Sequence, residues 1–149
     1  MELPQYVTTE EVQRVCSELG FRDWTKLAST EVLPEEARVL QTEVGSEALQ
    51  IPPDEFRRGL EVELEHGLAF PDANVTNNHP ILTAKIVLAH LKEMLDYYSR
   101  LEVAELEGDL FKASMGNDPQ KMAAKFKQLI TARGHLSQSE LAQQTGTWS

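Results

Sequence analysis

The stretch that decides the fold class is "PILTAKIVLAHLKEMLDYYSRLEVAELE", residues 80–107. Apolar side chains recur in it every three or four positions, which is the spacing of one face of an α-helix. They are Ile81, Ala84, Leu88, Leu91, Leu95 and Tyr98. Pro80 suits the first turn of a helix, and Gly108 suits its end. The pattern therefore predicts one long helix over residues 80–107.

Shorter segments on both sides carry the same helix signals. Three of them precede the long helix, each with a start signal and a closing glycine, at residues 8–20, 34–45 and 52–67. Beyond it, Asp118 and Pro119 open a further helix, and Ser137 with Glu140 forms a capping box that predicts a short last one. No segment alternates as a β-strand does. The sequence thus predicts an all-α fold: a compact helical bundle of about five or six helices, with one long helix and a C-terminal helical hairpin.

The sharpest internal divide is the run "GNDP" at residues 116–119. It predicts a helical body over residues 1–115 and a C-terminal helical appendage over residues 116–149, packed on the body. Part of this tail, "FKQLITARGHLSQSELAQQTGT", resembles the first two helices of a helix-turn-helix repressor. The helix that reads the major groove would have to follow Thr147.

Charge limits the classes of partner. The chain has 14 Lys and Arg against 24 Asp and Glu, a formal net charge of -10. Nucleic acid is therefore an unlikely partner, because phosphates would be repelled. The start of the chain lacks a basic region followed by an apolar run, and no stretch is long and apolar enough to span a membrane. We expect a cytoplasmic protein without membrane association; its partner, if a protein, is unidentified, and its oligomeric state is open.

One carboxylate in "GLEVELEHG", residues 59–67, lies where a solvated charge should not be. On a helical wheel, the apolar face of this segment holds Phe56, Leu60 and Leu64. Glu63 falls within that face, whereas Glu61 and Glu65 fall opposite and are expected to be solvated. A carboxylate on an apolar face costs free energy unless it is paired. Glu63 is therefore predicted to be buried and paired.

Two interpretations of this pairing remain open. His66 follows Glu63 by three positions, and the long helix carries His90 and Glu93 with the same spacing. Facing Glu/His pairs on neighbouring helices can hold zinc, iron or manganese, so Glu63, His66, His90 and Glu93 form a hypothetical divalent metal site. The alternative is a hydrogen-bonded polar cluster without metal, in which Glu63 pairs with His66, His90, the hydroxyl of Tyr97 or Tyr98, or an arginine at position 57 or 100.

Three segments carry a family resemblance: "FRRGLEVELEHG", "NVTNN" and "AKIVLAHLKEMLDYYSRLE". They resemble a family of small uncharacterised bacterial and phage proteins, a domain of unknown function with a VELEHG, NVT and AHLxExxDYYxRL signature. The resemblance covers most of Thr8 to Glu107, with an added helix between Trp24 and Gln50, and implies no activity. Its signature positions overlap the Glu/His cluster; they are Phe56, Gly59, Glu63, His66, Gly67, Asn74, Thr76, Lys85, His90, Glu93, Asp96, Tyr97 and Tyr98. Asn78 departs from the acidic residue that family members often carry.

Three functions are compatible with these patterns. The favoured one is an interaction or accessory module without chemistry of its own, because there is no glycine-rich phosphate loop, no nucleophile paired with a base and no cysteine cluster. The first alternative is a metal-binding helical protein, a hydrolase or oxidase, that uses the Glu/His cluster. The second is a DNA-binding regulator that acts through the helix-turn-helix-like tail. No catalytic residue is assigned.

Overall fold

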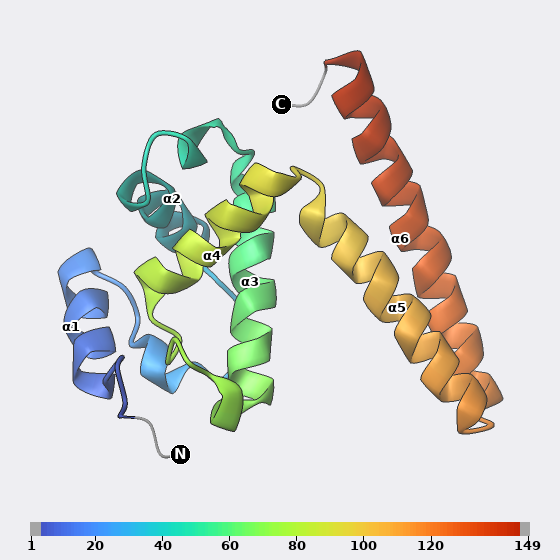
Figure 1. The fold of residues 1–149 in the computed structure, drawn as a ribbon, viewed down its shortest axis with the longest axis horizontal. Coiled ribbons are helices and arrows are strands. Elements are labelled where there is room, and N and C mark those ends of the chain that lie inside the picture. Colours follow the sequence, from blue (N-terminus) through green and yellow to red (C-terminus); the bar gives the residue numbers. More distant parts are fainter. Residues whose placement is uncertain (1–3, 147–149) are drawn as a thin grey trace. The chain divides into compact units, whose positions relative to one another are not determined.

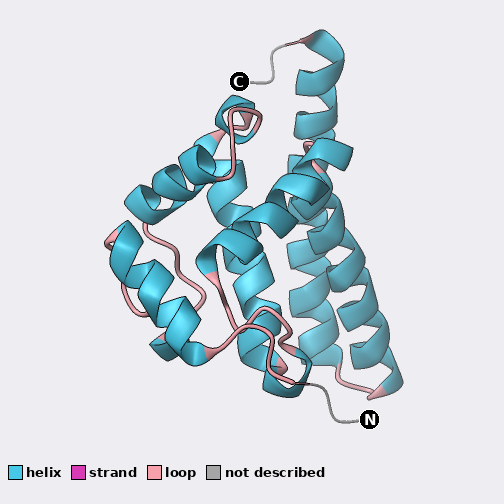
Figure 2. Cartoon of the chain, turned by 60° about the vertical axis from the view of Figure 1, so that its left-hand side comes forward, coloured by secondary structure: helices cyan, strands magenta, loops and turns pink. Residues whose placement is uncertain are grey.

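The computed structural model describes residues 4–146, and none of these residues lies in a β-strand (Figure 2). The described chain forms six α-helices: α1 Thr9–Leu19, α2 Pro34–Glu43, α3 Pro53–Ala69, α4 Pro80–Glu93, α5 Tyr97–Met115 and α6 Pro119–Thr145. Three short 3-10 helices lie at Trp24–Lys26, Ala48–Gln50 and Pro71–Ala73. The predicted all-α class is confirmed. No helix in this part of the chain is long and apolar enough to cross a membrane.

The prediction of one unbroken helix over residues 80–107 is wrong. The chain leaves the helix after Glu93 and re-enters it at Tyr97, whose N–H donates to the carbonyl oxygen of Met94 at 3.1 Å. The turn contains neither glycine nor proline, and its local helix-start signal is Asp96, which stands at the N-cap position of α5. Asp96 is buried there and accepts hydrogen bonds from Arg100 and Gln143. The break is therefore tied to a contact with a residue far along the chain.

The chain divides into two compact units at Glu93 and Met94. In the first unit, α3 packs against both α2 and α4 (Figure 1). Its fully buried large side chains include Trp24, Leu40, Phe56, Leu60 and Leu64. The three apolar positions predicted for residues 52–67 thus contribute to this core, because their helical spacing puts them on one face.

The second unit is an antiparallel hairpin of α5 and α6, which lie side by side along their lengths (Figure 1). Asp118 caps α6 as expected, since its side chain accepts the N–H of Lys121 at 2.9 Å. The helix start expected at Ser137 is wrong: α6 continues to Thr145. Leu129 and Ala132 lie in the buried cluster with Leu106 of α5, and the half-buried Leu136 continues their helical spacing, which favours continuation of the helix over a turn.

This geometry changes the description of the tail. The C-terminal hairpin is made by α5 and α6, not by two short helices after residue 116. Residues 119–145 contain no turn between two helices, so they do not have the helix-turn-helix arrangement that the tail sequence resembles. The boundary expected at residues 115 and 116 lies at the tip of the hairpin, whereas the compact units divide at residues 93 and 94.

Candidate functional site

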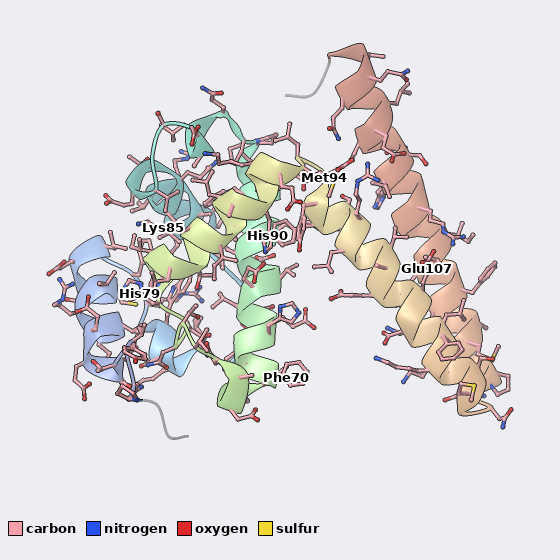
Figure 3. All side chains as sticks on the ribbon, in the orientation of Figure 1. Phe70, His79, Lys85, His90, Met94 and Glu107 are labelled. Atoms are coloured by element: carbon pink, nitrogen blue, oxygen red, sulfur yellow. The ribbon has the colours of Figure 1, made fainter. Side chains whose placement is uncertain are left out.

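A polar pocket of about 240 Å³ lies in the first unit. The second half of α3 supplies Glu63 and His66, the loop before α4 supplies Asn74 and Thr76, and α4 supplies Thr83. Phe70 also lines the pocket and is exposed; Figure 3 labels it at the end of α3. The pocket thus combines hydrogen-bonding groups with a larger apolar lining that also includes Val75 and Ile86.

Asparagine side chains fix the loop beside this pocket. The Nδ2 of Asn74 donates to the carbonyl oxygen of Gly67 at 3.2 Å and to Oδ1 of Asn78 at 2.9 Å. The hydroxyl of Thr76 donates to Oδ1 of Asn74 at 3.2 Å. Asn77 and Asn78 adopt left-handed backbone angles, with φ of 50° and 55°, which asparagine tolerates better than most residues. The loop is therefore tied to α3 by its own side chains.

Gly67 is required by this close approach. A Cβ atom at position 67 would lie 2.9 Å from Nδ2 of Asn74 and still closer to Oδ1 of Asn78. Both asparagine groups are engaged in the hydrogen bonds that hold the loop, so they cannot move away freely. The glycine that closes "VELEHG" therefore allows the loop to pack on α3, which stops at Ala69 two residues later.

His79 is a residue that sequence reasoning missed. It is buried directly before α4, and its Nδ1 accepts the N–H of Leu82 at 3.4 Å. Its Nε2 lies 4.0 Å from Oε1 of Glu11. Burial lowers the pKa of His79, and the negative charge of Glu11 opposes this only in part. The sequence signal for this role is the position of His79 immediately before Pro80. A proline suits the first turn of a helix, so a polar side chain just before it can cap that helix.

Protonation of His79 should weaken the fold. Since its pKa is lower in the folded protein than in the unfolded chain, the unfolded state binds more protons below about pH 6.5. The free energy of unfolding should therefore be highest above that pH and fall as the pH drops, by up to about 1.4 kcal/mol per pH unit until the folded form also protonates. His79→Asn keeps a capping oxygen without a titrating ring. Urea titrations from pH 7.5 to 5 should show that the free energy of unfolding falls less steeply in His79→Asn than in the wild type. If it falls equally in both proteins, protonation of His79 does not destabilise the fold.

Glu63 lies close to His90, a neighbour that both interpretations of its pairing include. Nε2 of His90 is 3.6 Å from Oε1 of Glu63, and their side chains are 32% and 16% exposed. Figure 3 labels His90 on α4, the helix that packs on α3. The structure therefore brings together one carboxylate and one imidazole from two neighbouring helices, at the side of the polar pocket.

The other predicted site residues are more scattered. His66 lines the same pocket as Glu63 but is exposed, and Glu93 is exposed at the end of α4. Tyr97 and Tyr98 belong to the second unit, where their rings meet edge to face at 5.1 Å. Among residues 4–146, no three His, Cys, Asp or Glu side chains gather in a way that could hold a metal ion.

Glu61 does not have the solvated position that the helical wheel predicted. Its Oε1 accepts the N–H of Val32 at 3.2 Å and lies 3.6 Å from Nη1 of Arg57. The segment before α2 passes over this side of α3, which a wheel drawn for a single helix cannot show. Glu65 is exposed, as predicted.

A second concave surface, which we call the hairpin groove, lies between α5 and α6. It has a volume of about 660 Å³ and an apolar lining of Leu110, Phe111, Met122, Ala123, Phe126 and Leu129. Phe111 is 67% exposed and Phe126 54%. Glu107, labelled on α5 in Figure 3, and Arg133 of α6 also line the groove, and their charged atoms are 2.6 Å apart. In the sequence, the groove is visible as a second apolar stripe on each of the two helices. The predicted helix end at residue 107 and the predicted helix start at Ser137 interrupt these stripes, so the groove was not predicted.

Comparison with known proteins supports the resemblance found in the sequence. The model of one family, described as "Protein of unknown function (DUF5661)", matches residues 12–107. This range includes the whole polar pocket, Glu63 and His90, and it ends within α5. Searches of curated proteins and of solved structures find no match. Because the family model covers more than half of the chain, the protein belongs to this family of proteins of unknown function.

Proposed function

We propose that this protein is an interaction module that binds another helical surface through the hairpin groove and performs no chemistry of its own. The observation that carries the proposal is the groove itself, with two phenylalanine side chains more than half exposed on its walls. Aromatic and methionine side chains are enriched in the buried centres of protein interfaces. A groove between two helices is also a common receptor for an amphipathic helix.

The exposed apolar side chains of the hairpin support this proposal. Leu106, Leu129 and Ala132 form a buried cluster with Val103 and Leu110 packed against them, and Tyr98 and Ala113 of α5 are also buried. Met115 of α5 and Ile130 of α6 are also exposed. Covering a large apolar side chain is worth about 1.5–3 kcal/mol, so a partner that covers several of them gains enough to bind. The hairpin therefore has more apolar surface than its own packing uses.

Dye binding tests whether the groove is an accessible apolar surface. At the lowest workable protein concentration, the folded protein should bind an apolar fluorescent dye such as anilinonaphthalene sulfonate in a saturable manner. Phe111→Ser and Phe126→Ser should each weaken this binding several-fold, because they remove the walls of the groove. Leu49→Ser is the matched control, since Leu49 is equally exposed but lies in the first unit. Equal dye binding by all variants would contradict a role for the groove.

Metal binding at Glu63 and His90 is the second candidate function. Their ligand atoms are 3.6 Å apart, close to the roughly 3.3 Å that separates two ligands of a tetrahedral zinc ion. Such a site would take zinc, iron or manganese, with water completing the coordination. Calorimetric titration with Zn²⁺ alone should show a binding event in the wild type that is lost in both Glu63→Ala and His90→Ala. Glu65→Ala is the control, and identical titrations of all four proteins would remove this candidate.

A further inference from the structure

We infer that the polar pocket of the first unit binds a primary amine attached to a short apolar group. The inference is independent of the hairpin groove, because all residues that line this pocket belong to the first unit. Three features carry it: a carboxylate in the pocket wall, a buried hydroxyl that no described residue binds, and the apolar remainder of the lining.

The charge of the lining favours a cation. Among the described residues that line the pocket, Glu63 is acidic and none is Lys or Arg. The unit around it has eight Lys and Arg against seventeen Asp and Glu over residues 1–93, so its formal net charge is -9. Such a surplus attracts cations and repels anions. Oε1 of Glu63 lies 3.6 Å from Nε2 of His90, and since a carboxylate accepts several hydrogen bonds at once, this contact is compatible with an ammonium group.

A buried hydroxyl in the same pocket favours a ligand with several hydrogen-bond donors. Thr83 of α4 lines the pocket and is 3% exposed. Its backbone N–H donates to the carbonyl oxygen of His79 at 2.9 Å, but its hydroxyl makes no hydrogen bond with any other residue of the range 4–146. This hydroxyl is therefore left to water or to a ligand in the pocket. A primary ammonium group has three donors, so one ligand can pair with Glu63 and also supply a partner for Thr83.

The polar groups of the loop beside the pocket are already used within the protein. Nδ2 of Asn74 donates to Gly67 and Asn78, and its Oδ1 accepts the hydroxyl of Thr76. The loop therefore forms a fixed wall of the pocket. Recognition of a charged ligand is left to side chains of α3 and α4.

The rest of the lining favours an apolar group of limited size. Val75 and Ile86 line the pocket, and Phe70 lies at the end of α3 with 58% of its surface exposed (Figure 3). The face of an aromatic ring attracts a cation, and its edge contacts apolar groups. The volume of about 240 Å³ is below the roughly 300–1,000 Å³ of pockets for drug-sized ligands. The ligand that fits is a small free amine or the end of a lysine side chain.

Nuclear magnetic resonance titration of the isotope-labelled full chain with benzylamine at neutral pH tests the inference. The amide signals of Gly67, Asn74 and Thr83 should shift in a saturable manner. Benzyl alcohol has the same shape without the charge, so it should bind at least about tenfold more weakly, because hydrogen bonds to charged groups are stronger. Benzoate has the opposite charge and should leave these signals unchanged.

Two variants test the two polar groups separately. Glu63→Gln should weaken benzylamine binding at least about tenfold, and Thr83→Val about fivefold. Glu65→Gln, an exposed change on the same helix, is the control and should bind as the wild type does. Thr83→Val should not lower the melting temperature, since valine has nearly the shape of threonine. A hydroxyl with a purely structural role would give the reverse: lower stability and unchanged amine binding.

The two sources of the amine are distinguished by a blocked lysine, Nα-acetyl-lysine amide, titrated beside butylamine. Equal binding of the two would identify a lysine side chain, and binding at least about tenfold weaker for the blocked lysine would identify a free amine. Binding of benzylamine should persist with a chelator, which separates it from the metal candidate; loss of binding would overturn the inference. Equal binding of benzylamine and benzyl alcohol, unchanged binding by Glu63→Gln, or no shift with either amine up to about 10 mM would also overturn it.

Discussion

Replacing Glu36 with alanine should lower the free energy of unfolding by about 3 kcal/mol, because Trp24, Arg22 and Leu33 lose a common acceptor that is itself buried. Glu36 is buried in the first unit. Its carboxylate accepts hydrogen bonds from Nε and Nη2 of Arg22 at 3.1 and 2.8 Å, from Nε1 of Trp24 at 3.4 Å and from the N–H of Leu33 at 3.1 Å. One side chain therefore joins α2 to the segment that follows α1.

The same site should make the fold sensitive to acid. Burial acts to raise the pKa of Glu36, but the hydrogen bonds from Arg22, Leu33 and Trp24 outweigh it, so the pKa lies below its usual value. The stabilisation is therefore complete above about pH 4.5 and is lost as the pH falls through the pKa of the folded form. In Glu36→Ala, the fall in the free energy of unfolding that accompanies protonation of Glu36 should be absent.

Urea unfolding at several pH values measures both effects. Glu35→Ala is the matched control, since Glu35 is the neighbouring residue on α2 and is exposed. It should change the free energy of unfolding by less than about 0.5 kcal/mol. Glu36→Gln keeps an acceptor for Trp24 but loses the charge that faces Arg22, so its effect should lie between the two. Equal stabilities of Glu35→Ala and Glu36→Ala would show that the buried contacts of Glu36 contribute nothing.

The fold class could be predicted because helix periodicity and capping are local properties. Thr8 and Gly20 flank α1, and the side chain of Thr8 accepts the N–H of Glu11 as the capping pattern requires. Pro34 and Pro53 open α2 and α3 for the same reason. These features depend only on neighbours within one turn, so a sequence is sufficient to find them.

Features that depend on distant segments could not be predicted in this way. Val32 binds Glu61 from a segment 29 residues away, so the face of α3 expected to be solvated is partly covered. The break between α4 and α5 coincides with contacts of Asp96 to Arg100 and to Gln143, 47 residues away. Helical wheels contain neither contact, because they assume that each helix is alone.

In the candidate sites, too, local features could be predicted from the sequence and contacts between distant segments could not. The helical wheel predicted that Glu63 is buried, but its side chain is only partly buried, at 16% exposed, where it lines a pocket beside the loop before α4. The exposed side chains of Phe111 and Phe126 are visible in the sequence as apolar residues. Their position on opposite walls of one groove follows only from the antiparallel packing of α5 on α6. That packing joins residues far apart in the sequence, such as Leu106 with Leu129 and Asp109 with Lys125, and no local pattern predicts these pairs.

Replacing Asp96 should have an effect of similar size in the second unit. Asp96 is buried at the start of α5, and its two oxygens accept Nε and Nη2 of Arg100 at 2.9 and 2.8 Å. Oδ2 also accepts Nε2 of Gln143 at 3.0 Å, near the end of α6. Paired hydrogen bonds between arginine and a carboxylate are among the strongest in proteins, and burial limits the water that could replace them. Asp96→Ala should therefore cost about 3 kcal/mol.

The loss should be localised, and this makes the prediction specific. Gln143 and Arg100 both depend on Asp96, and Arg100 in turn pairs with Glu140, so the last turns of α6 lose their attachment to α5 together. Amide hydrogen exchange should accelerate over residues 136–145 much more than near Asp118, where α6 begins with its own cap. Glu105→Ala, an exposed change on α5, should leave both regions unchanged. Uniform acceleration along α6 would contradict a local role, because it would mean that Asp96 supports the whole hairpin rather than its open end.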